Sequence, residues 1–569
     1  MSSVGGGQRQ SCAPGIVTRG SIALAPRTLA HSARCVTVVC LAPLPPPTTP
    51  MLGIPSLLML AGAGLILLAR RRHERAWWLI ALGTSVVAWL STLLLLRGIP
   101  WLVGVSVWRP EELFASRLEL VLDGQGWQLL FASVTLLLCV LITAVERRRE
   151  ATATGRAMML AYSGLAVLAL LAGNLLTVAT TWVLLDLSAF AFLATILTKE
   201  DSARDLVSRL AIDSAGVLLV LGATVAQAAA PEVAQAGAPP SPLSVVLVSL
   251  AVLLRLGLFP PHFALPTLPG VRRGLGTLLR LLPAAVALAA LGRALEQGVP
   301  SPAQLWLRLG GALGVVIGGL RWVSEAEAVG GRRFLVLGLS GLGVLAATMD
   351  GAPSGAVLAA TGMLVLLVGA AVSLNEIHTP AHRVWIALAA LFILGLPATP
   401  GALIAGLLLR GVQLPGDRAV ASLGILGMFL LGLGTFRRAF APQTAWVSGE
   451  SLVRLLYSAG LLLPLLAGIG LTIREGAVLS PPGIVLFGVL ATTGALGAAA
   501  AQRLEGRRFD RWRRWLGYLD PSPVYAALGM LIGGSMRALR SIGDLIEGEG
   551  AMLWTYVVLL LVLLAVLGG

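Results

Sequence analysis

Charge is scarce in this chain. Of its 569 residues, 12% are charged and 57% are hydrophobic, whereas about a quarter of the residues of an average soluble domain carry charge. Apolar runs such as Ala157 to Thr177 are about as long as the 20 residues that a helix needs to cross hydrocarbon. The short alternating segments of a membrane β-barrel do not appear. The composition therefore predicts an all-α polytopic membrane protein with roughly 16 transmembrane helices.

Lysine is almost absent, since Lys199 is the only one. Arginine supplies the remaining basic charge, and unlike a buried lysine it cannot release its proton inside a protein. The net charge of +15 does not indicate a nucleic-acid partner, because the arginines cluster at helix ends, as the positive-inside rule requires. When the arginine-rich side of the membrane is taken as cytoplasmic, both ends of the membrane domain face away from the cytoplasm. The clusters are Arg70 to Arg72, Arg147 to Arg149, Arg272 and Arg273, Arg332 and Arg333, Arg437 and Arg438, and Arg507 to Arg514.

Motifs of soluble enzymes are also missing. The sequence has no phosphate-binding GxxxxGK[ST] loop, no HExxH zinc motif and no nucleophile elbow. Its four cysteines form no CxxC pair and no cluster with histidine. We therefore expect no cofactor and no metal site in this chain, and we leave open whether it belongs to an enzyme other than as a non-redox membrane subunit.

Two of the expected spans contain proline-rich interruptions. The seventh span ends with Pro260 and Pro261, and the twelfth carries Pro397 and Pro400 near its middle. Proline removes a helical hydrogen bond and clashes with the preceding turn, so both helices are predicted to break. If spans four to eight and nine to thirteen are two repeats, the breaks occupy matching places, which is typical of transporter ion sites. The alternative is a pair of merely kinked helices.

Ionisable residues inside membrane spans are costly and usually functional. The candidates for a proton or ion path are Asp186, Asp213, Arg255, His262 and Arg280. An unpaired charge at this depth is unfavourable, so Asp186 is predicted to face Arg255 across neighbouring helices. The alternatives are an ion pair that only fixes helix packing and, for Asp213 and Arg280, side chains that reach the membrane interface.

Several segments, taken in order, resemble one family, the antiporter-like membrane subunits of respiratory complex I, Mrp cation/proton antiporters and membrane-bound hydrogenases. The resemblance covers about residues 115 to 567. The matching segments are the LDG element Leu122 to Gly124, Asn174 to Trp182, Phe259 to Pro266, which is similar to FPLHxWLPDA, Thr277 to Arg280, and Gly395 to Gly401, which looks like GLPPxAGF.

Departures from the family pattern fall on its charged residues. Val183 occupies the place of the family glutamate, and Asp186, three residues later on the same helical face, is expected to substitute for it. Arg255 stands for a lysine and Arg280 for a histidine. The lysine expected after the second break falls near Ala405, where no charge exists. The second break is therefore predicted not to relay protons by a lysine.

The resemblance implies two inverted five-helix repeats with broken helices. We expect the chain to divide into four parts. These are a low-complexity leader (1–50, expected to be dispensable), N-terminal transmembrane helices (51–150), an antiporter-like core (151–440) and C-terminal helices (441–569). The last part is expected to hold a lateral amphipathic helix, with Leu528, Ile532 and Met536 at helical spacing, and a final span.

The resemblance also implies a membrane subunit of a complex I-like energy-converting assembly that contributes to proton translocation coupled to electron transport. Its partners would be other membrane and redox subunits, protons or monovalent cations, and the lipid bilayer of a prokaryotic plasma membrane, with no nucleic acid. The alternatives are an Mrp-like cation/proton antiporter subunit and a degenerate structural subunit that conducts no ions.

Overall fold

The computed structural model describes residues 50–71, 74–105, 116–146, 152–196, 200–229, 241–259, 273–296, 299–325, 328–441, 450–474 and 481–503, with a few isolated positions besides. Pro260, Pro261 and His262, nearly all of the leader, the lateral amphipathic helix and the final span lie outside these residues. The predictions made for them stay predictions.

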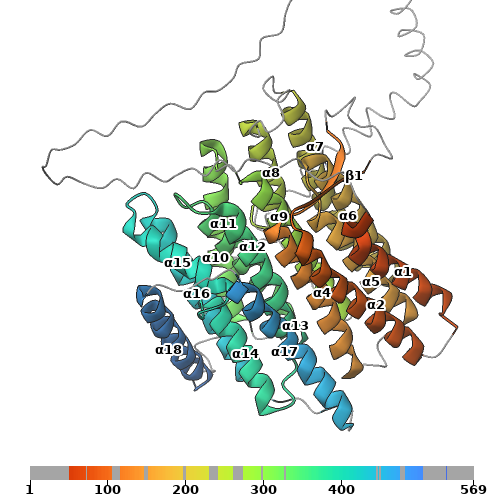
Figure 1. Cartoon of the computed structure of the whole chain (residues 1–569). Coiled ribbons are helices and arrows are strands. Elements are labelled where there is room, and N and C mark those ends of the chain that lie inside the picture. The colour runs from red at the N-terminus through yellow and green to blue at the C-terminus, as the bar shows by residue number, and fades with distance from the viewer. Residues whose placement is uncertain are drawn as a thin grey trace, which may run out of the picture. The chain divides into compact units, whose positions relative to one another are not determined.

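The described chain is a bundle of helices that run side by side (Figure 1). Its first half contains η1 (Pro50–Gly53), α1 (Ile54–Leu68), α2 (Glu74–Leu95), η2 (Leu96–Gly98), β1 (Trp101–Val105), β2 (Leu118–Leu122), α4 (Gly124–Thr143), α5 (Ala153–Leu170), α6 (Leu175–Ile196), α7 (Glu200–Ala228), α8 (Pro242–Arg255) and α9 (Arg273–Ala294). Its second half contains α10 (Ser301–Ser324), α11 (Ala328–Ala347), α12 (Ser354–Met363), the π-helical turn η5 (Leu364–Val368), α13 (Gly369–Leu374), α14 (Pro380–Ile393), α15 (Pro400–Gln413), α16 (Arg418–Ala439), α17 (Ser451–Arg474) and α18 (Pro481–Arg503).

Twelve helices in the described part are long and apolar enough to cross a membrane, and α1, α8 and α14 are shorter apolar helices. This confirms the predicted all-α polytopic membrane fold. The helices lie where the sequence has its long apolar runs, and the twelfth expected span corresponds to the pair α14 and α15. The agreement follows from the long apolar runs, which must satisfy their backbone hydrogen bonds internally when they lie in lipid.

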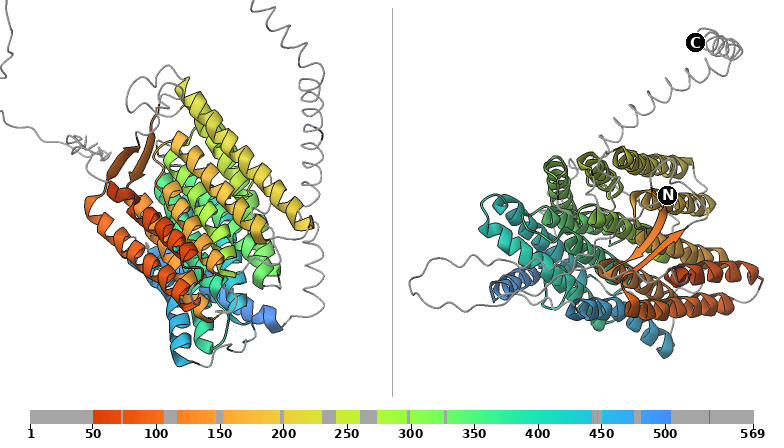
Figure 2. Two further views of the ribbon diagram at one scale, coloured as in Figure 1. Left: turned by 90° about the vertical axis from the view of Figure 1, so that its right-hand side faces the viewer. Right: turned by 45° about the horizontal axis from the view of Figure 1, so that its top comes forward.

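A short antiparallel hairpin of β1 and β2 interrupts the helical pattern, pairing Trp101 with Leu122 (Figure 2). The sequence analysis predicted no strand here. Leu120 also bridges Ala172 in the connection between α5 and α6. The LDG element has a local role, because the Asp123 carboxylate accepts a hydrogen bond of 2.6 Å from the backbone N–H of Gly126 and so caps α4.

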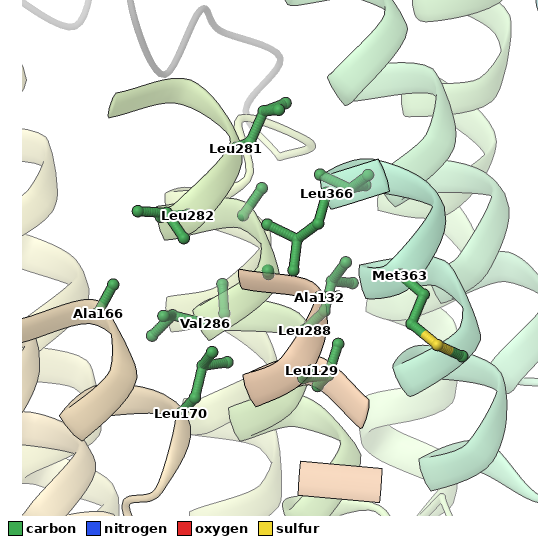
Figure 3. Close-up of a cluster of buried hydrophobic side chains, with 14 of the residues drawn as sticks. Leu129, Ala132, Ala166, Leu170, Leu281, Leu282, Val286, Leu288, Met363 and Leu366 are labelled. Atoms are coloured by element: carbon green, nitrogen blue, oxygen red, sulfur yellow. The ribbon is translucent and has the colours of Figure 1, made fainter. Parts of the chain in front are cut away.

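The continuous span from α12 through η5 to α13 lies at the centre, and its residues from Ser354 to Leu374 are buried except for the half-buried Ala356. Helices α4 and α9 pack against it with apolar side chains, and α5 packs on these two helices (Figure 3). Helix α18 instead packs mainly on α16 at the edge of the bundle (Figure 1). The first-half helices that hold Asp186 and Arg255 are therefore supported from one side by an apolar core.

The second predicted break is confirmed, because α14 ends at Ile393 and α15 begins at Pro400. Helix α8 ends at Arg255, before the prolines that were expected to break it. Both ends share the sequence Leu-Gly-Leu and the same geometry: the glycine has a positive φ of 71° at Gly257 and 87° at Gly395. The next N–H then donates to a carbonyl five residues back, at 2.8 Å for Leu258 and 2.9 Å for Leu396. This is the glycine-dependent helix stop that satisfies terminal carbonyls without proline.

Candidate functional site

Asp186 on α6 and Arg255 at the end of α8 form a two-pronged ion pair, as predicted. Arg255 Nη2 donates to Asp186 Oδ1 at 2.5 Å, and Nη1 donates to Oδ2 at 2.9 Å. Asp186 is 8% exposed and Arg255 is 4% exposed. The planar guanidinium matches a carboxylate in this parallel geometry, which a lysine ammonium cannot do. Removal of either partner would leave a buried uncompensated charge.

Trp182 forms one wall of this site. The Arg255 guanidinium lies 4.4 Å from the centre of its ring, within the range of a cation–π contact. Trp182 is fully buried, while the next residue, Val183, is 37% exposed. Val183, in the place of the family glutamate, is therefore the more exposed of the two positions, and the substitution of Asp186 for that glutamate stays a prediction. The boundary between the buried and the exposed face of α6 runs between Val183 and Asp186.

A second ion pair lies beside the first. On α7, Arg209 Nε donates to Asp213 Oδ2 at 3.2 Å, across one helical turn. Both side chains interact electrostatically with Asp186. We call Asp186, Arg209, Asp213 and Arg255 the four-charge layer. The sequence analysis missed Arg209, although its i,i+4 spacing to Asp213 is a signal for such a pair.

Arg280 on α9 does not join the pairs. Among the described residues its guanidinium makes no hydrogen bond or ion pair, and its nearest charges are the positive Arg209 and Arg333. Arg280 therefore lies apart from the two ion pairs, although it was one of the five candidates for the proton or ion path. His262, the fifth candidate, lies outside the described residues.

The second break is apolar and closed. The hydroxyl of Thr399 is buried and donates to the Leu396 carbonyl at 2.6 Å. A Cβ atom added at Gly401 would lie 1.9 Å from the Phe392 carbonyl oxygen, so the ends of α14 and α15 are in close backbone contact. Ala402 and Ala405 are buried beside them. The described residues of this break provide no titrating side chain.

Two histidines form a separate cluster at the end of the bundle where α9 begins. His382 Nε2 lies 3.1 Å from Ser458 Oγ, and the ring of His378 stacks on Trp446 with centroids 4.3 Å apart. Glu376 pairs with Arg273 at this arginine-rich end. Glu376, His378 and His382 come just before the twelfth expected span in the sequence. The structure adds the aromatic side chains that hold both rings.

A pocket of about 280 Å³ opens at the opposite, arginine-poor ends of α6, α7, α8 and α9. Arg293 on α9 donates to the Leu170 carbonyl at 2.6 Å beside it. Between this pocket and the four-charge layer, the side chains on the facing sides of these helices are mostly apolar. The hydrogen-bonding side chains that line the pocket are Ser116, Asn174, Thr224, Gln227, Ser244 and Arg293.

No protein-family model and no curated protein matches the sequence. Three solved structures are similar in fold. A chain of the Mrp complex from Dietzia sp. DQ12-45-1b aligns with TM-score 0.64 and 17% identity over 90% of this chain and 62% of that chain, so this protein spans less than two thirds of its length. A chain of the membrane-bound sulfane sulfur reductase, an archaeal respiratory membrane complex, aligns with TM-score 0.62 and 14% identity over 90% of this chain and all of that one.

A chain of respiratory complex I from Thermus thermophilus with bound aureothin aligns with TM-score 0.56 and 19% identity, over 76% of this chain and 98% of that chain. The likeness confirms at the level of fold the resemblance found in the sequence. The protein is a divergent example of the membrane-subunit fold found in these three complexes.

Proposed function

We propose that this protein is a membrane subunit of a multisubunit energy-converting complex and that it contributes to proton translocation through the Asp186–Arg255 pair. The bidentate pair carries the proposal, because it is buried where α8 stops inside the bundle. Ionisable groups at such helix ends mark ion pathways in membrane proteins. Redox chemistry would belong to partner subunits, and the membrane would be a prokaryotic plasma membrane with the arginine-rich end inside.

The chemistry of the pair assigns the two residues different roles. Asp186 can exchange a proton, whereas Arg255 keeps its charge under all working conditions. Arg255 therefore acts as a fixed counter-charge that holds Asp186 in place, and Trp182 holds the guanidinium from the side. The second break, where the described residues offer no titrating side chain, would serve packing and not transfer.

An Mrp-like cation/proton antiporter subunit is the second candidate. It is supported by the fold likeness to a chain of the Mrp complex over 90% of this protein. In both cases Asp186 would be the exchanging acid. The identity of co-purifying subunits separates the two candidates, because redox subunits are expected only in the first.

A flux assay on the reconstituted native assembly tests the role of Asp186. We expect Asp186→Asn to abolish proton movement and Thr399→Val to leave it unchanged. Asp350→Asn provides the same chemical change at an exposed acid on the arginine-poor side and should behave as the parent does. Normal flux in Asp186→Asn with lost flux in Thr399→Val would reverse the assignment. Unchanged flux in every variant would favour the structural alternative.

A further inference from the structure

The arginine-poor pocket and the four-charge layer are connected by aligned side chains on three helices. On α7, Thr224, Val220, Val217 and Asp213 recur at spacings of four, three and four residues. This spacing places them on one face of the helix. Thr224 lines the pocket and Asp213 belongs to the four-charge layer, so this face of α7 runs from one to the other.

Helix α8 repeats the arrangement in the opposite chain direction. Ser244 and Val248 line the pocket, Val252 follows one turn later, and Arg255 ends the series in the four-charge layer. On α6, Val178 lines the pocket, followed at four-residue intervals by Trp182 and Asp186. Helices α6 and α7 pack together, as do α7 and α8.

The side chains between pocket and charges are almost all valine. We define the valine layer as Val217 and Val220 on α7 together with Val248 and Val252 on α8, all of them buried. Two hydrogen-bonding groups without a partner among the described residues lie at this level, the indole N–H of Trp182 and the hydroxyl of Ser249, which follows Val248 on α8. From Thr224 to Asp213 the helix advances about 16 Å, or about three turns, and Val220 and Val217 lie in the middle of that length.

We propose that the valine layer is a hydrophobic gate between a water-filled vestibule on the arginine-poor side and the four-charge layer. The pocket offers hydrogen-bonding side chains to water, whereas the valines offer none, so water is excluded from the layer at rest. A gate of this kind opens by wetting and needs no titrating residue of its own. The inference rests on the proposed function, since it gives Asp186 access to the arginine-poor side through the first half of the chain.

Thiol accessibility in the full chain within its native assembly tests the gate without any flux measurement. The background has its four native cysteines replaced, Cys139 by alanine and Cys12, Cys35 and Cys40 by serine. A charged, membrane-impermeant methanethiosulfonate is applied from the arginine-poor side. Thr224→Cys should react. Val225, the next residue, lies on the outer face of α7 and is 54% exposed. Val225→Cys should not react, because lipid suppresses the thiolate.

The gate itself is tested with Val217→Cys, which lies beneath Val220. We expect this thiol to be protected alone and to react at least about tenfold faster when Val220→Thr is added, since threonine keeps the shape of valine and adds a hydroxyl that water can bind. The matched control Val225→Thr makes the same change on the outer face and should have no effect.

Protection of Thr224→Cys, or equal reactivity of Val217→Cys with and without Val220→Thr, would overturn the gate. Labelling does not depend on ion movement. Loss of the predicted labelling with normal flux would therefore refute the gate alone, whereas the predicted labelling in an assembly that moves no protons would refute the proposed function alone.

Discussion

Replacing Asp186 by asparagine leaves the guanidinium of Arg255 buried at 4% exposure with its charge uncompensated. Breaking a buried pair in this way costs about 3–5 kcal/mol, because the remaining charge keeps its desolvation penalty and loses its partner. Arg255→Gln should cost a similar amount for the same reason. The double variant Asp186→Asn with Arg255→Gln removes both charges, keeps the shape of the Asp186 side chain, shortens the other side chain by two heavy atoms and leaves two neutral amides in place of the ion pair.

We therefore expect the double variant to lie within about 1–2 kcal/mol of the parent, with a coupling free energy of at least about 2 kcal/mol between the two sites. The assay is thermal or denaturant-induced unfolding of the purified assembly in detergent, with the yield of assembled protein as a second readout. Additive single effects, with the double variant as unstable as their sum, would refute the bidentate pair.

The parent, the two single variants and the double variant also distinguish a functional role of the pair from a purely structural one. If the pair only fixes helix packing, the double variant should recover both assembly and proton flux. If Asp186 exchanges protons, the double variant should recover assembly and still move none, because neither amide titrates. Recovered flux in the double variant would end the proposed role of Asp186.

Three further changes test the fold. Gly401→Ala should destabilise the protein by about 1–3 kcal/mol, since its new methyl group would lie 1.9 Å from the α14 carbonyl oxygen. Gly406→Ala on the same helix has open space and should be neutral or slightly stabilising. Equal melting temperatures of the two variants would contradict the close contact at the break. Asp123→Ala should lower the free energy of unfolding by about 1 kcal/mol through loss of the α4 cap, and an unchanged denaturation midpoint would argue against that cap. Asp417→Asn should cost about 1–3 kcal/mol, because the buried Asp417 carboxylate accepts a 2.6 Å bond from Arg308; denaturation in detergent measures it, and an unchanged midpoint would show that the pair contributes little.

The positions of the helices were predictable because lipid imposes one requirement on every spanning segment. Runs of about 20 apolar residues must form helices there, and the expected spans coincide with the observed helices. The break at Gly395 to Thr399 was predicted from Pro397 and Pro400, but Gly395 and its hydrogen bonds stop α14 before the first of these prolines. The end of α8 was predicted near the right place but from prolines, whereas Gly257 and its hydrogen bonds stop the helix first.

The contact of Asp186 with Arg255 followed from the cost of an unpaired buried charge, which allows few partners. Sequence alone could not show which side of α6 faces the bundle, so the burial of Asp186 beside the exposed Val183 emerged only from packing. The exclusion of Arg280 from the layer has the same origin, since apolar periodicity does not specify how neighbouring helices rotate against each other. The hairpin of β1 and β2 was also missed, because its short strands are stabilised by pairing with each other and with the α5–α6 connection.

The sequence by itself determined that this protein lies in a membrane, where its helices run, and that a few costly charges must find partners within it. Those properties depend on the chemistry of single residues and of the chain near them. Only the tertiary structure decided which charges meet, that α14 and α15 are in close backbone contact at the second break, and that four buried valines from two helices align with the arginine-poor pocket and the four-charge layer. These properties depend on the rotation and contact of helices that are distant in sequence, which local chemistry does not specify.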